Sequence, residues 1–532
     1  MSKVRNMYGG KFDGLLRVND FDVEGPGTFK NRQVGEKNIA GIRADEAHRT
    51  RPPRKVLLIP ARIDSARFLS LGIGCLAGYL RKEGHEVTVW EELPTTKKSL
   101  EEVVRKFGPD VVGFSTMTSQ FTKGLELAYK VKEVRPDVPI IFGGVHPTAA
   151  PKETLLQNEM IDFVCVGEGE YTMTEFLDHL DNREFEGIKG LGYRDEGGVH
   201  VNSSRGVIRD LDSLPMPARD LFDMDYYRQR WNWPRGMWLS TANVMSSRGC
   251  PFDCTFCASK VMFGRGFKPR SVENTMAEVE YLLDTYGFNC ISFSDDTFAI
   301  QKQRAMEIGR EFKRRNLKAV FRVQLRVDTC DADLIEALKE GGLIHVDFGI
   351  ESGSEKILAS LKKGFRTEDV YAAIDTVKKQ KISVGATFLI GSISETLADV
   401  EETRNLARKI GADYTQFFIM TPYPGTELWD YARERNLMFE NITYEHFRHG
   451  GVQLQPFMKV ELTSDGLIRM QDDLNNEFVN PTIRKYLRHP RFLADLGLKF
   501  VKEPSSLGRF VKTYATTFNV GKALKAVMPH NL

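Results

Sequence analysis

The sequence contains no run of about 20 apolar residues, the length that a membrane-spanning helix needs. Its polar start, Met1 to Asp20, also lacks the apolar segment of a signal peptide. Cysteine is scarce, with seven in 532 residues, which excludes the disulfide framework of a small secreted protein. Excess charge of one sign is missing too, because 74 basic and 72 acidic residues leave a net charge of +2. We therefore expect a cytoplasmic protein with no nucleic-acid partner.

Hydrophobic residues are plentiful, since they make up 41% of the chain, enough for two or three globular domains. Composition and apolar patterning divide the chain into five expected segments. These are an irregular N-terminal extension at 1–53, a front domain at 54–185, a linker at 186–238, a barrel at 239–430 and a mainly helical, basic region at 431–532.

Two separate alternations of strands and helices are predicted. The front domain has five short apolar strands, at 55–60, 86–90, 110–115, 139–142 and 163–166. This order is typical of an α/β fold with a doubly wound, Rossmann-like parallel sheet, whose ligands lie beyond the carboxyl ends of the strands. Six later strands, at 242–246, 290–294, 320–325, 345–350, 384–390 and 414–420, predict a partial (β/α)6 barrel of the TIM type.

Three of the cysteines, Cys250, Cys254 and Cys257, lie together directly after the first barrel strand. Barrel enzymes keep their chemistry at this end of the strands. Three soft thiolates on one short loop suit three irons of a cubane cluster and leave the fourth iron open. Two other interpretations are a structural zinc site, which needs a fourth Cys or His at short spacing, and a set of buried free thiols, which would not group in this way.

This cysteine spacing, with Phe256 before the third cysteine, resembles the radical S-adenosylmethionine superfamily, and the resemblance extends over about residues 236–430. It implies that the three cysteines hold a [4Fe–4S] cluster whose open iron binds S-adenosylmethionine. One electron then cleaves the sulfonium to a 5′-deoxyadenosyl radical. A low-potential electron donor of the flavodoxin or ferredoxin type is the partner that this chemistry implies.

The same resemblance assigns residues at later strand ends to S-adenosylmethionine. Ser294 and Asp295 correspond to groups that receive the methionyl ammonium, Glu351 to the residue that bonds the ribose or the amino group, and Gly391 to the adenine side. Taken alone, Asp295 and Glu351 are also typical of solvated helix caps. Related sequences carry Pro and Gly where this chain has Ile393 and Ser394, so the path of that loop and any role of Glu395 stay open.

The front domain resembles the cobalamin-binding domain that precedes the barrel in one branch of this superfamily. The resemblance rests on Ser115, on the paired Gly143 and Gly144, and on Gly167, each at the end of a predicted strand. Glycine at such a point lets the backbone approach a ligand closely. A flavodoxin-like domain with an empty pocket is the alternative.

The Asp-x-His-x-x-Gly element, which supplies a lower axial histidine to cobalt in other cobalamin proteins, is missing after the first strand, where Ala61 to Ala66 stand instead. We therefore expect cobalt to lack a protein imidazole. His146 follows Gly143 and Gly144 closely, and we expect it to lie near the ligand without binding cobalt.

Two cofactor modules in one chain favour a methyltransferase that acts on an unactivated carbon of a small-molecule or lipid-like substrate. An oxidation, cyclisation or rearrangement with the same cofactors stays open. A cluster-containing redox protein without turnover is the third hypothesis, although a plain electron carrier needs no nucleoside pocket.

The C-terminal region is strongly basic, since residues 481–532 carry ten Lys or Arg and two acidic residues, a net charge of +8. Apolar residues recur there at helical spacing and predict two amphipathic helices. They are Phe492, Leu493, Leu496 and Phe500, then Leu507, Phe510, Val511 and Tyr514. These helices either lie on an anionic membrane surface or cover the open side of the partial barrel.

Overall fold

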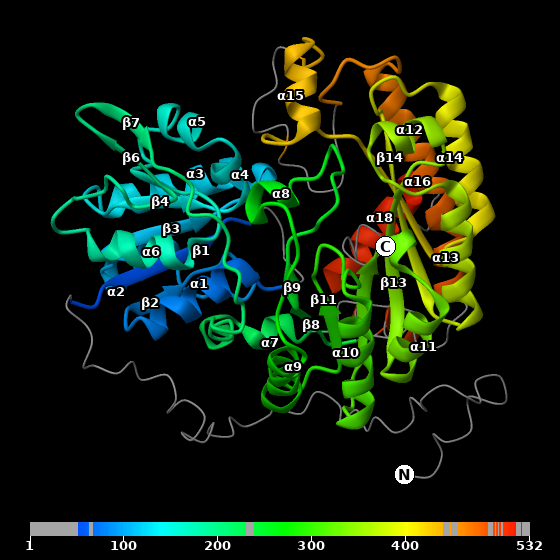
Figure 1. Ribbon diagram of the computed structural model, residues 1–532, viewed down its shortest axis with the longest axis horizontal. Coiled ribbons are helices and arrows are strands. Elements are labelled where there is room, and N and C mark those ends of the chain that lie inside the picture. Colours follow the sequence, from blue (N-terminus) through cyan, green and yellow to red (C-terminus); the bar gives the residue numbers. More distant parts are fainter. Residues whose placement is uncertain are drawn as a thin grey trace.

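The computed structural model describes residues 52–62, 68–229, 239–439, 447 and 456–487, together with parts of 493–523. Two α/β units lie side by side, and the C-terminal helices lie on the second unit (Figure 1). The predicted extension at 1–53 lies, apart from Pro52 and Pro53, outside the described residues. The same holds for Phe492 of the predicted tail helices.

The front sheet has seven strands in the order β2-β1-β3-β4-β5-β6-β7. Its first five strands are parallel, which confirms the predicted doubly wound sheet. The strands are β1 Lys55–Pro60, β2 Glu86–Val89, β3 Val111–Ser115, β4 Ile140–Gly143, β5 Phe163–Cys165, β6 Leu191–Asp195 and β7 Gly198–Val201. The helices are α1 Leu71–Lys82, α2 Leu100–Phe107, α3 Phe121–Val134, α4 Val145–Ala149, α5 Pro151–Leu156 and α6 Gly169–Asp178.

The strands of this sheet carry apolar side chains on both faces, and helices therefore cover both faces of the sheet. On β1, Leu57 and Ile59 pack with α2 and α3, whereas Val56 and Leu58 pack with α1 and α6. Strands buried on both faces read as continuous apolar runs, which is why they can be recognised in the sequence.

The linker predicted at 186–238 is partly wrong. Residues Leu191–Val201 fold as the antiparallel hairpin β6-β7, and β6 pairs with β5, so the front sheet extends beyond residue 185. The sequence does not predict this hairpin because β7 is only four residues long, has exposed ends and carries no apolar run. Farther on, the chain crosses to the barrel through η6 Arg219–Leu221 and α7 Met224–Tyr227.

The second sheet has six parallel strands in the order β15-β14-β13-β12-β11-β8, which confirms the predicted partial barrel. The strands are β8 Thr241–Val244, β11 Cys290–Phe293, β12 Val320–Leu325, β13 Leu343–Glu351, β14 Ser383–Ile390 and β15 Tyr414–Ile419. The helices are α9 Val272–Tyr286, α10 Lys302–Arg314, α11 Ala332–Glu340, α12 Glu355–Ser360, α13 Thr367–Lys379, α14 Leu397–Ile410 and α15 Glu427–Glu434. A small hairpin, β9 Ser247–Arg248 with β10 Lys268–Pro269, follows β8.

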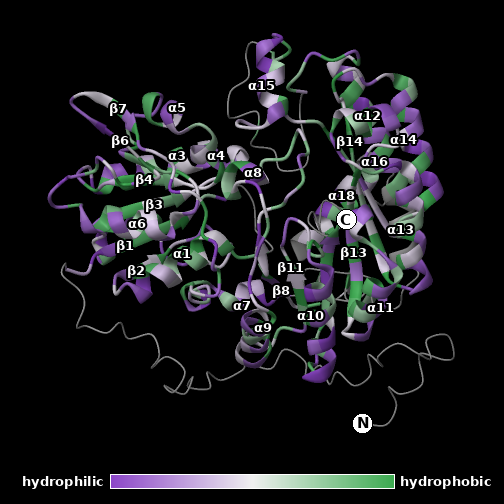
Figure 2. Cartoon of the chain, in the orientation of Figure 1, coloured by the Kyte–Doolittle hydropathy of each residue, from purple (hydrophilic) through white to green (hydrophobic). Residues whose placement is uncertain are grey.

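Sequence signals set the ends of the barrel helices. Ser271 caps α9 by accepting from the Asn274 N–H, and Gly287 ends the helix at a φ of 68°. Figure 2 shows apolar strands enclosed by helices whose outer surfaces are hydrophilic. No helix in the described part of the chain is long and apolar enough to cross a membrane.

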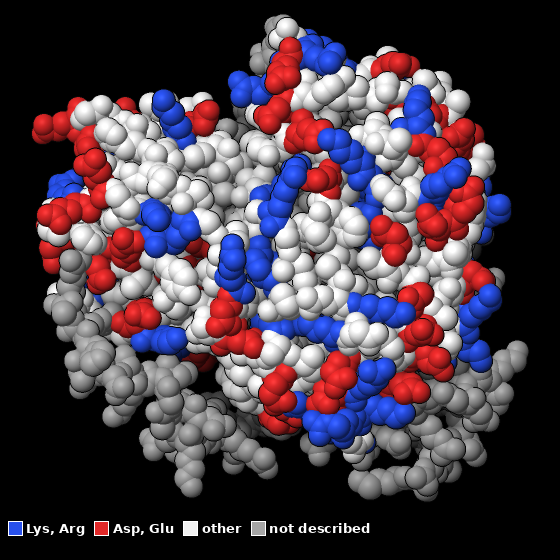
Figure 3. Space-filling model, viewed as in Figure 1, with Lys and Arg blue, Asp and Glu red and all other residues white. Residues whose placement is uncertain are grey.

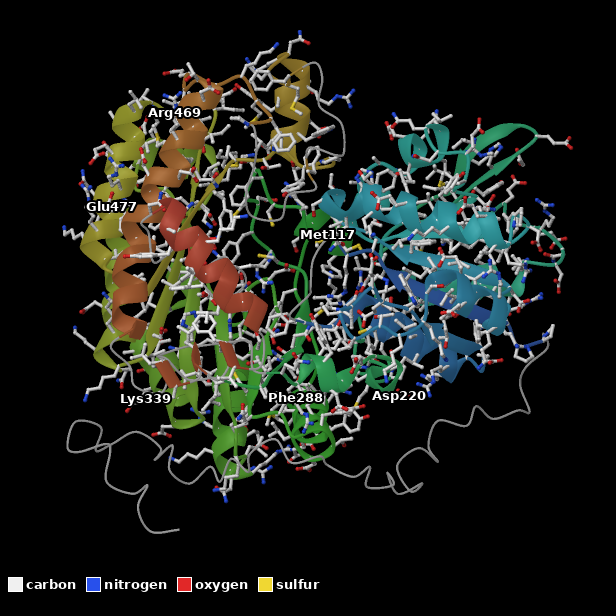
Figure 4. All side chains as sticks on the ribbon, turned by 180° about the vertical axis from the view of Figure 1, so that it is seen from behind. Met117, Asp220, Phe288, Lys339, Arg469 and Glu477 are labelled. Carbon is white, nitrogen blue, oxygen red and sulfur yellow. The ribbon has the colours of Figure 1, made fainter. Side chains whose placement is uncertain are left out.

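The last strand, β15, leaves one edge of the sheet open, and α16 (Ser464–Leu487) covers it. The side-chain amide of Asn475 accepts from the Phe417 N–H and donates to the Phe417 carbonyl, at 2.9 and 3.0 Å. Seen from behind, α16 lies along the barrel and α18 (Pro504–Thr517) crosses in front of its strands (Figure 4). The first part of the C-terminal region therefore completes the barrel edge.

Candidate active site between two cofactor edges

The three clustered cysteines lie on the loop between β9 and α8 (Ser259–Phe263) at the carboxyl end of β8. Cys254 is buried, and Cys250 and Cys257 are half-buried, all three as free thiols. The loop is held through Thr255, whose N–H donates to the Leu361 carbonyl at 3.2 Å and whose carbonyl accepts from the Leu428 N–H at 3.0 Å. Two barrel connections thus hold the loop between them.

The donor set of this loop suits a cubane better than a single ion. Within the described residues, no three His, Cys, Asp or Glu side chains converge as the ligands of one metal ion do. A cubane spreads its thiolates more widely, because each binds a different iron. Burial raises the pKa of Cys250, and that of Cys257 to about 11, so iron binding has to displace these protons.

Glu351 and Phe256 lie on either side of a buried lysine. Lys363 Nζ is 3.1 Å from Glu351 Oε1 and 2.9 Å from the Gly349 carbonyl. The same ammonium lies 5.9 Å from the centre of the Phe256 ring. Glu351 has a φ of 74°, a region that residues other than glycine avoid, and such strain is common at ligand sites. The structure therefore brings two of the predicted residues to the cysteine loop.

Asp295 has a structural role that differs from the predicted one. Its side chain is 1% exposed and accepts from both the Ser246 and the Ser247 hydroxyl at 2.8 Å. Burial raises its pKa to about 6. The carboxylate thus fixes the chain that leads into the cysteine loop, and the exposed Ser294 is the predicted group of this pair that stays open to a ligand.

The loop after β14 keeps a glycine-like path although it carries a serine. Ser394 adopts a φ of 61°, the conformation for which glycine is ordinarily used. Glu395 is fully buried and accepts from the N–H groups of Gly391 and Ser392, and burial raises its pKa to about 7. The role of Glu395, which the sequence left open, is to hold this loop, with Gly391 packed against Leu467 of α16.

All four residues predicted for cobalamin line one pocket at the carboxyl edge of the front sheet. Ser115, Gly143, Gly144 and Gly167 border about 750 Å³ of space, including its open mouth. Gly144 has a φ of 95°, and a Cβ there would lie 2.6 Å from the Thr116 carbonyl oxygen, so no other residue fits. Glycine at position 144 is therefore required by the close approach of the Thr116 backbone at the border of the pocket.

The second wall of this pocket comes from the cysteine loop. Met262 and Phe263, on α8 directly after Cys257, line the pocket together with Met245 and Arg248. Thr148 joins the two walls, because its hydroxyl accepts from the Gly167 N–H at 2.9 Å and lies 3.8 Å from the Met262 sulfur. Figure 1 shows α8 beside α4 at this junction. The arrangement places the two predicted cofactor sites next to each other.

His146 faces away from this pocket. Its ring packs against Phe121, with the ring centres 4.2 Å apart, and its Nδ1 lies 3.3 Å from the Thr118 hydroxyl. Burial lowers its pKa to about 4. His146 is not among the described residues that line the pocket.

A buried ion-pair cluster ties the cysteine loop to the front domain. Arg248, two residues before Cys250, contacts Glu168 Oε1 at 2.5 Å and Glu170 Oε1 at 2.8 Å. All three side chains are at most 8% exposed. Glu168 also accepts from the Ile208 N–H at 2.6 Å. One cation therefore joins the turn after β5 to the loop that carries the thiols.

Comparisons with known proteins agree with both halves of this site. The family described as B12 binding domain matches residues 66–177, and the Radical SAM superfamily matches residues 244–407. An uncharacterized methyltransferase of Pyrococcus horikoshii is 38% identical over 371 residues, which cover 69% of this chain and 79% of the relative. The anaerobic magnesium-protoporphyrin IX monomethyl ester cyclase of Rubrivivax gelatinosus is 26% identical, over 78% of this chain and 74% of the relative.

A solved structure shows the same arrangement of domains. The cobalamin-dependent S-adenosylmethionine radical enzyme OxsB, with aqua-cobalamin and S-adenosylmethionine bound, matches at a TM-score of 0.66 and 18% identity. The match covers 88% of this chain and 73% of that chain. Fold and comparisons thus define an enzyme that uses cobalamin, S-adenosylmethionine and a [4Fe–4S] cluster. The chain belongs to the cobalamin-binding branch of the radical S-adenosylmethionine superfamily.

Three basic residues of the site are not identified by the sequence patterns. Arg248 precedes the Gly249-Cys250 pair, Arg326 directly follows β12, and Lys363 stands in a Lys-Lys-Gly turn. Each is at most 7% exposed. A basic residue at the end of an apolar strand can be recognised in a sequence. The buried groups that it contacts, however, lie far away along the chain.

Replacement of Arg248 by Gln should lower the free energy of unfolding by about 3–5 kcal/mol, because two buried carboxylates lose their shared cation. Urea unfolding of the full chain measures this change. Arg265→Gln is the matched control, since Arg265 is 76% exposed and pairs with Asp253 at 3.1 Å. The control should change stability by less than about 1 kcal/mol. Equal unfolding midpoints for the two variants would contradict the importance of the buried cluster.

Cobalamin bound to this protein should show a base-off visible spectrum and, as cob(II)alamin, an electron paramagnetic resonance signal without nitrogen superhyperfine splitting. The reason is that no histidine is among the described residues that line the pocket, and that His146 packs against Phe121. His146→Ala should leave the spectrum unchanged. Nitrogen splitting that disappears in this variant would show that His146 binds cobalt after all.

Proposed function

We propose that the protein transfers a methyl group to an unactivated carbon of a small polar molecule, with an electron supplied by a flavodoxin or ferredoxin. The observation that carries this proposal is the pocket in which Gly144 and Gly167 of the front sheet lie with Met262 and Phe263 of α8, the helix that follows the cysteine loop. A methyl carrier and a radical source can act on one substrate only when they lie this close. The methyltransferase of Pyrococcus horikoshii supports the same reaction class.

In this proposal Cys250, Cys254 and Cys257 hold the cluster, and Ser294, Glu351 and the loop at Gly391 bind S-adenosylmethionine. The cluster supplies the electron that cleaves S-adenosylmethionine, and cobalamin carries the methyl group. The buried Lys363 pairs with Glu351 at the edge of the site and orients its carboxylate. Helix α8 packs against α4 at the junction between the two sites, with Gly425 close to Val261 of α8 and Ala149 of α4.

The inner wall of the barrel favours a polar substrate over a hydrocarbon. Phe321, Val323 and Leu325 of β12 are buried beneath the helices, so the alternate residues Arg322 and Gln324 face the inside. Arg322 Nη2 lies 2.8 Å from Asp347 Oδ2, and both side chains remain about a quarter exposed, at 23% and 24%. An apolar ligand would have to desolvate this pair without replacing its contacts with water.

A second reaction class with the same cofactors is favoured by one comparison. The relative from Rubrivivax gelatinosus is named as a cyclase, so oxidation or cyclisation is the alternative to methyl transfer. A redox protein without turnover is less well supported, because Glu351 and Lys363 form a buried, strained site that an electron carrier does not need.

The anaerobically reconstituted protein should form 5′-deoxyadenosine from S-adenosylmethionine and reductant, and Cys254→Ala should abolish this activity. Cys290→Ala, a buried cysteine of β11 outside the loop, is the matched control and should retain it. With S-adenosylmethionine labelled on its methyl group, extract from a deletion strain should yield a labelled product larger by one CH2 group. A product that lacks the label while deoxyadenosine forms would favour cyclisation or oxidation. Full activity of Cys254→Ala would overturn the cluster assignment.

We also propose that the C-terminal region contacts an anionic membrane surface. The support is an apolar stripe on α18, where Leu507, Val511 and Tyr514 are 45%, 55% and 42% exposed. Arg509 and Lys512 stand beside this stripe. Basic and apolar groups on one helix are typical of segments that lie on membranes. In the view of Figure 3, by contrast, basic and acidic side chains are intermixed over the barrel.

The protein should sediment with vesicles of phosphatidylserine and phosphatidylcholine at low salt, and less so at physiological ionic strength, where the screening length is about 8 Å. Val511→Glu should abolish the sedimentation by placing a charge in the stripe. Tyr129→Glu, at a residue 57% exposed on α3, is the matched control and should not change it. If the protein stays in the supernatant at low salt, the C-terminal region serves only to cover the barrel.

A further inference from the structure

Arg326 is a buried basic side chain that makes direct contact with the cysteine loop. It directly follows β12, at the carboxyl end of the barrel, and is 6% exposed. Its Nη1 donates to the sulfur of Cys254 at 3.6 Å. Its guanidinium carbon lies 3.6 Å from the centre of the Phe252 ring, so the planar group stacks on a second residue of the same loop.

Two further contacts fix the direction in which the guanidinium points. Asp328 accepts from Nε and from Nη2, both at 2.9 Å, in a bidentate pair. The Lys363 carbonyl also accepts from Nη2. Because Asp328 and Lys363 engage Nε and Nη2, Nη1 is the group left for the sulfur. The contact with Cys254 is therefore imposed by the surroundings of Arg326.

This contact bears on the sulfur that the proposed function assigns to a cluster ligand. Hydrogen bonds to cluster sulfurs and nearby charges are among the factors that set the reduction potential of an iron–sulfur cluster. Reduction adds one electron, so the reduced cluster is more negative than the oxidised one. A buried cation with an N–H directed at the sulfur stabilises the reduced form more than the oxidised form.

We propose that Arg326 raises the reduction potential of the [4Fe–4S] cluster by donating to Cys254. The inference rests on the proposed function, in which Cys250, Cys254 and Cys257 bind the cluster. One electron passes from a low-potential donor, which is oxidised, to the cluster, whose charge falls from 2+ to 1+. Arg326 makes this transfer more favourable without touching the substrate, so it is a positioning residue.

A purely structural role for Arg326 is distinguishable, because charge effects on a potential have a sign. Loss of the cation in Arg326→Gln should lower the potential. Loss of the neighbouring anion in Asp328→Asn should raise it, since the guanidinium then faces the sulfur without its counter-charge. If the role of Arg326 is purely structural, both variants should loosen the same loop and shift the reduction potential in the same direction or not at all.

The test is a redox titration of the reconstituted full-length protein, followed by the electron paramagnetic resonance signal of the reduced cluster, with iron and sulfide content measured in parallel. At the wild-type midpoint potential, Arg326→Gln should lower the ratio of reduced to oxidised cluster at least tenfold, which corresponds to 59 mV for one electron. Arg326→Lys keeps the positive charge but lacks the planar guanidinium, so its midpoint potential should lie between those of the wild type and Arg326→Gln. Arg265→Gln removes an exposed cation beside Asp253 of the same loop and should leave the potential unchanged.

The outcomes separate this inference from the assignment of the cysteines. Arg326→Gln with full iron content and the wild-type potential would overturn the inference. A lower potential in Asp328→Asn would also overturn it, and this variant decides the matter if Arg326→Gln fails to hold iron. A wild-type protein that binds no cluster would instead refute the cysteine assignment, and the iron and sulfide content reports this independently of any potential.

Discussion

The buried pairing of Arg248 with Glu168 and Glu170 is the contact on which the relation between the two halves of the site depends. Removal of three charged groups from water is costly, and such a cluster is stable only when every charge has its partner. Glu168 comes from the turn after β5 and Glu170 from the first turn of α6, whereas the guanidinium comes from the strand that leads into the cysteine loop. The cofactor edges of two separate sheets are thereby held at one place.

Both sheets present the carboxyl ends of their parallel strands to this junction, which is where α/β folds bind ligands. The front sheet contributes glycine-rich turns that leave room for a large ligand, and the barrel contributes thiols, Glu351 and the loop at Gly391. Because α8 follows Cys257 directly and packs against α4, the chain between the two cofactors is short. The fold itself therefore supplies the proximity that a reaction with two cofactors requires.

Basic side chains organise the cysteine loop in two different ways. Arg248 connects it to the front domain, and Arg326 stacks on Phe252 and points at the sulfur of Cys254. The carboxylate of Asp295, by contrast, accepts hydrogen bonds from the Ser246 and Ser247 hydroxyls. The same loop is thus held by charged groups, and the loop residues that Arg326 contacts lie more than 70 positions away from it in the sequence.

The sequence alone determined the two sheets, because buried parallel strands appear as apolar runs, and it identified the cysteines and the glycine turns, because their function resides in closely spaced residues. It did not reveal the hairpin β6-β7, because β7 is a short strand with exposed ends and no apolar run. Nor could it separate the exposed Ser294 from the buried Asp295, because tertiary packing decides which of two adjacent polar side chains is buried. Only the tertiary structure brought Arg248, Arg326 and Lys363 to the site. Ion pairs and sulfur contacts form between residues 12 to 80 positions apart, and no local pattern encodes such a separation.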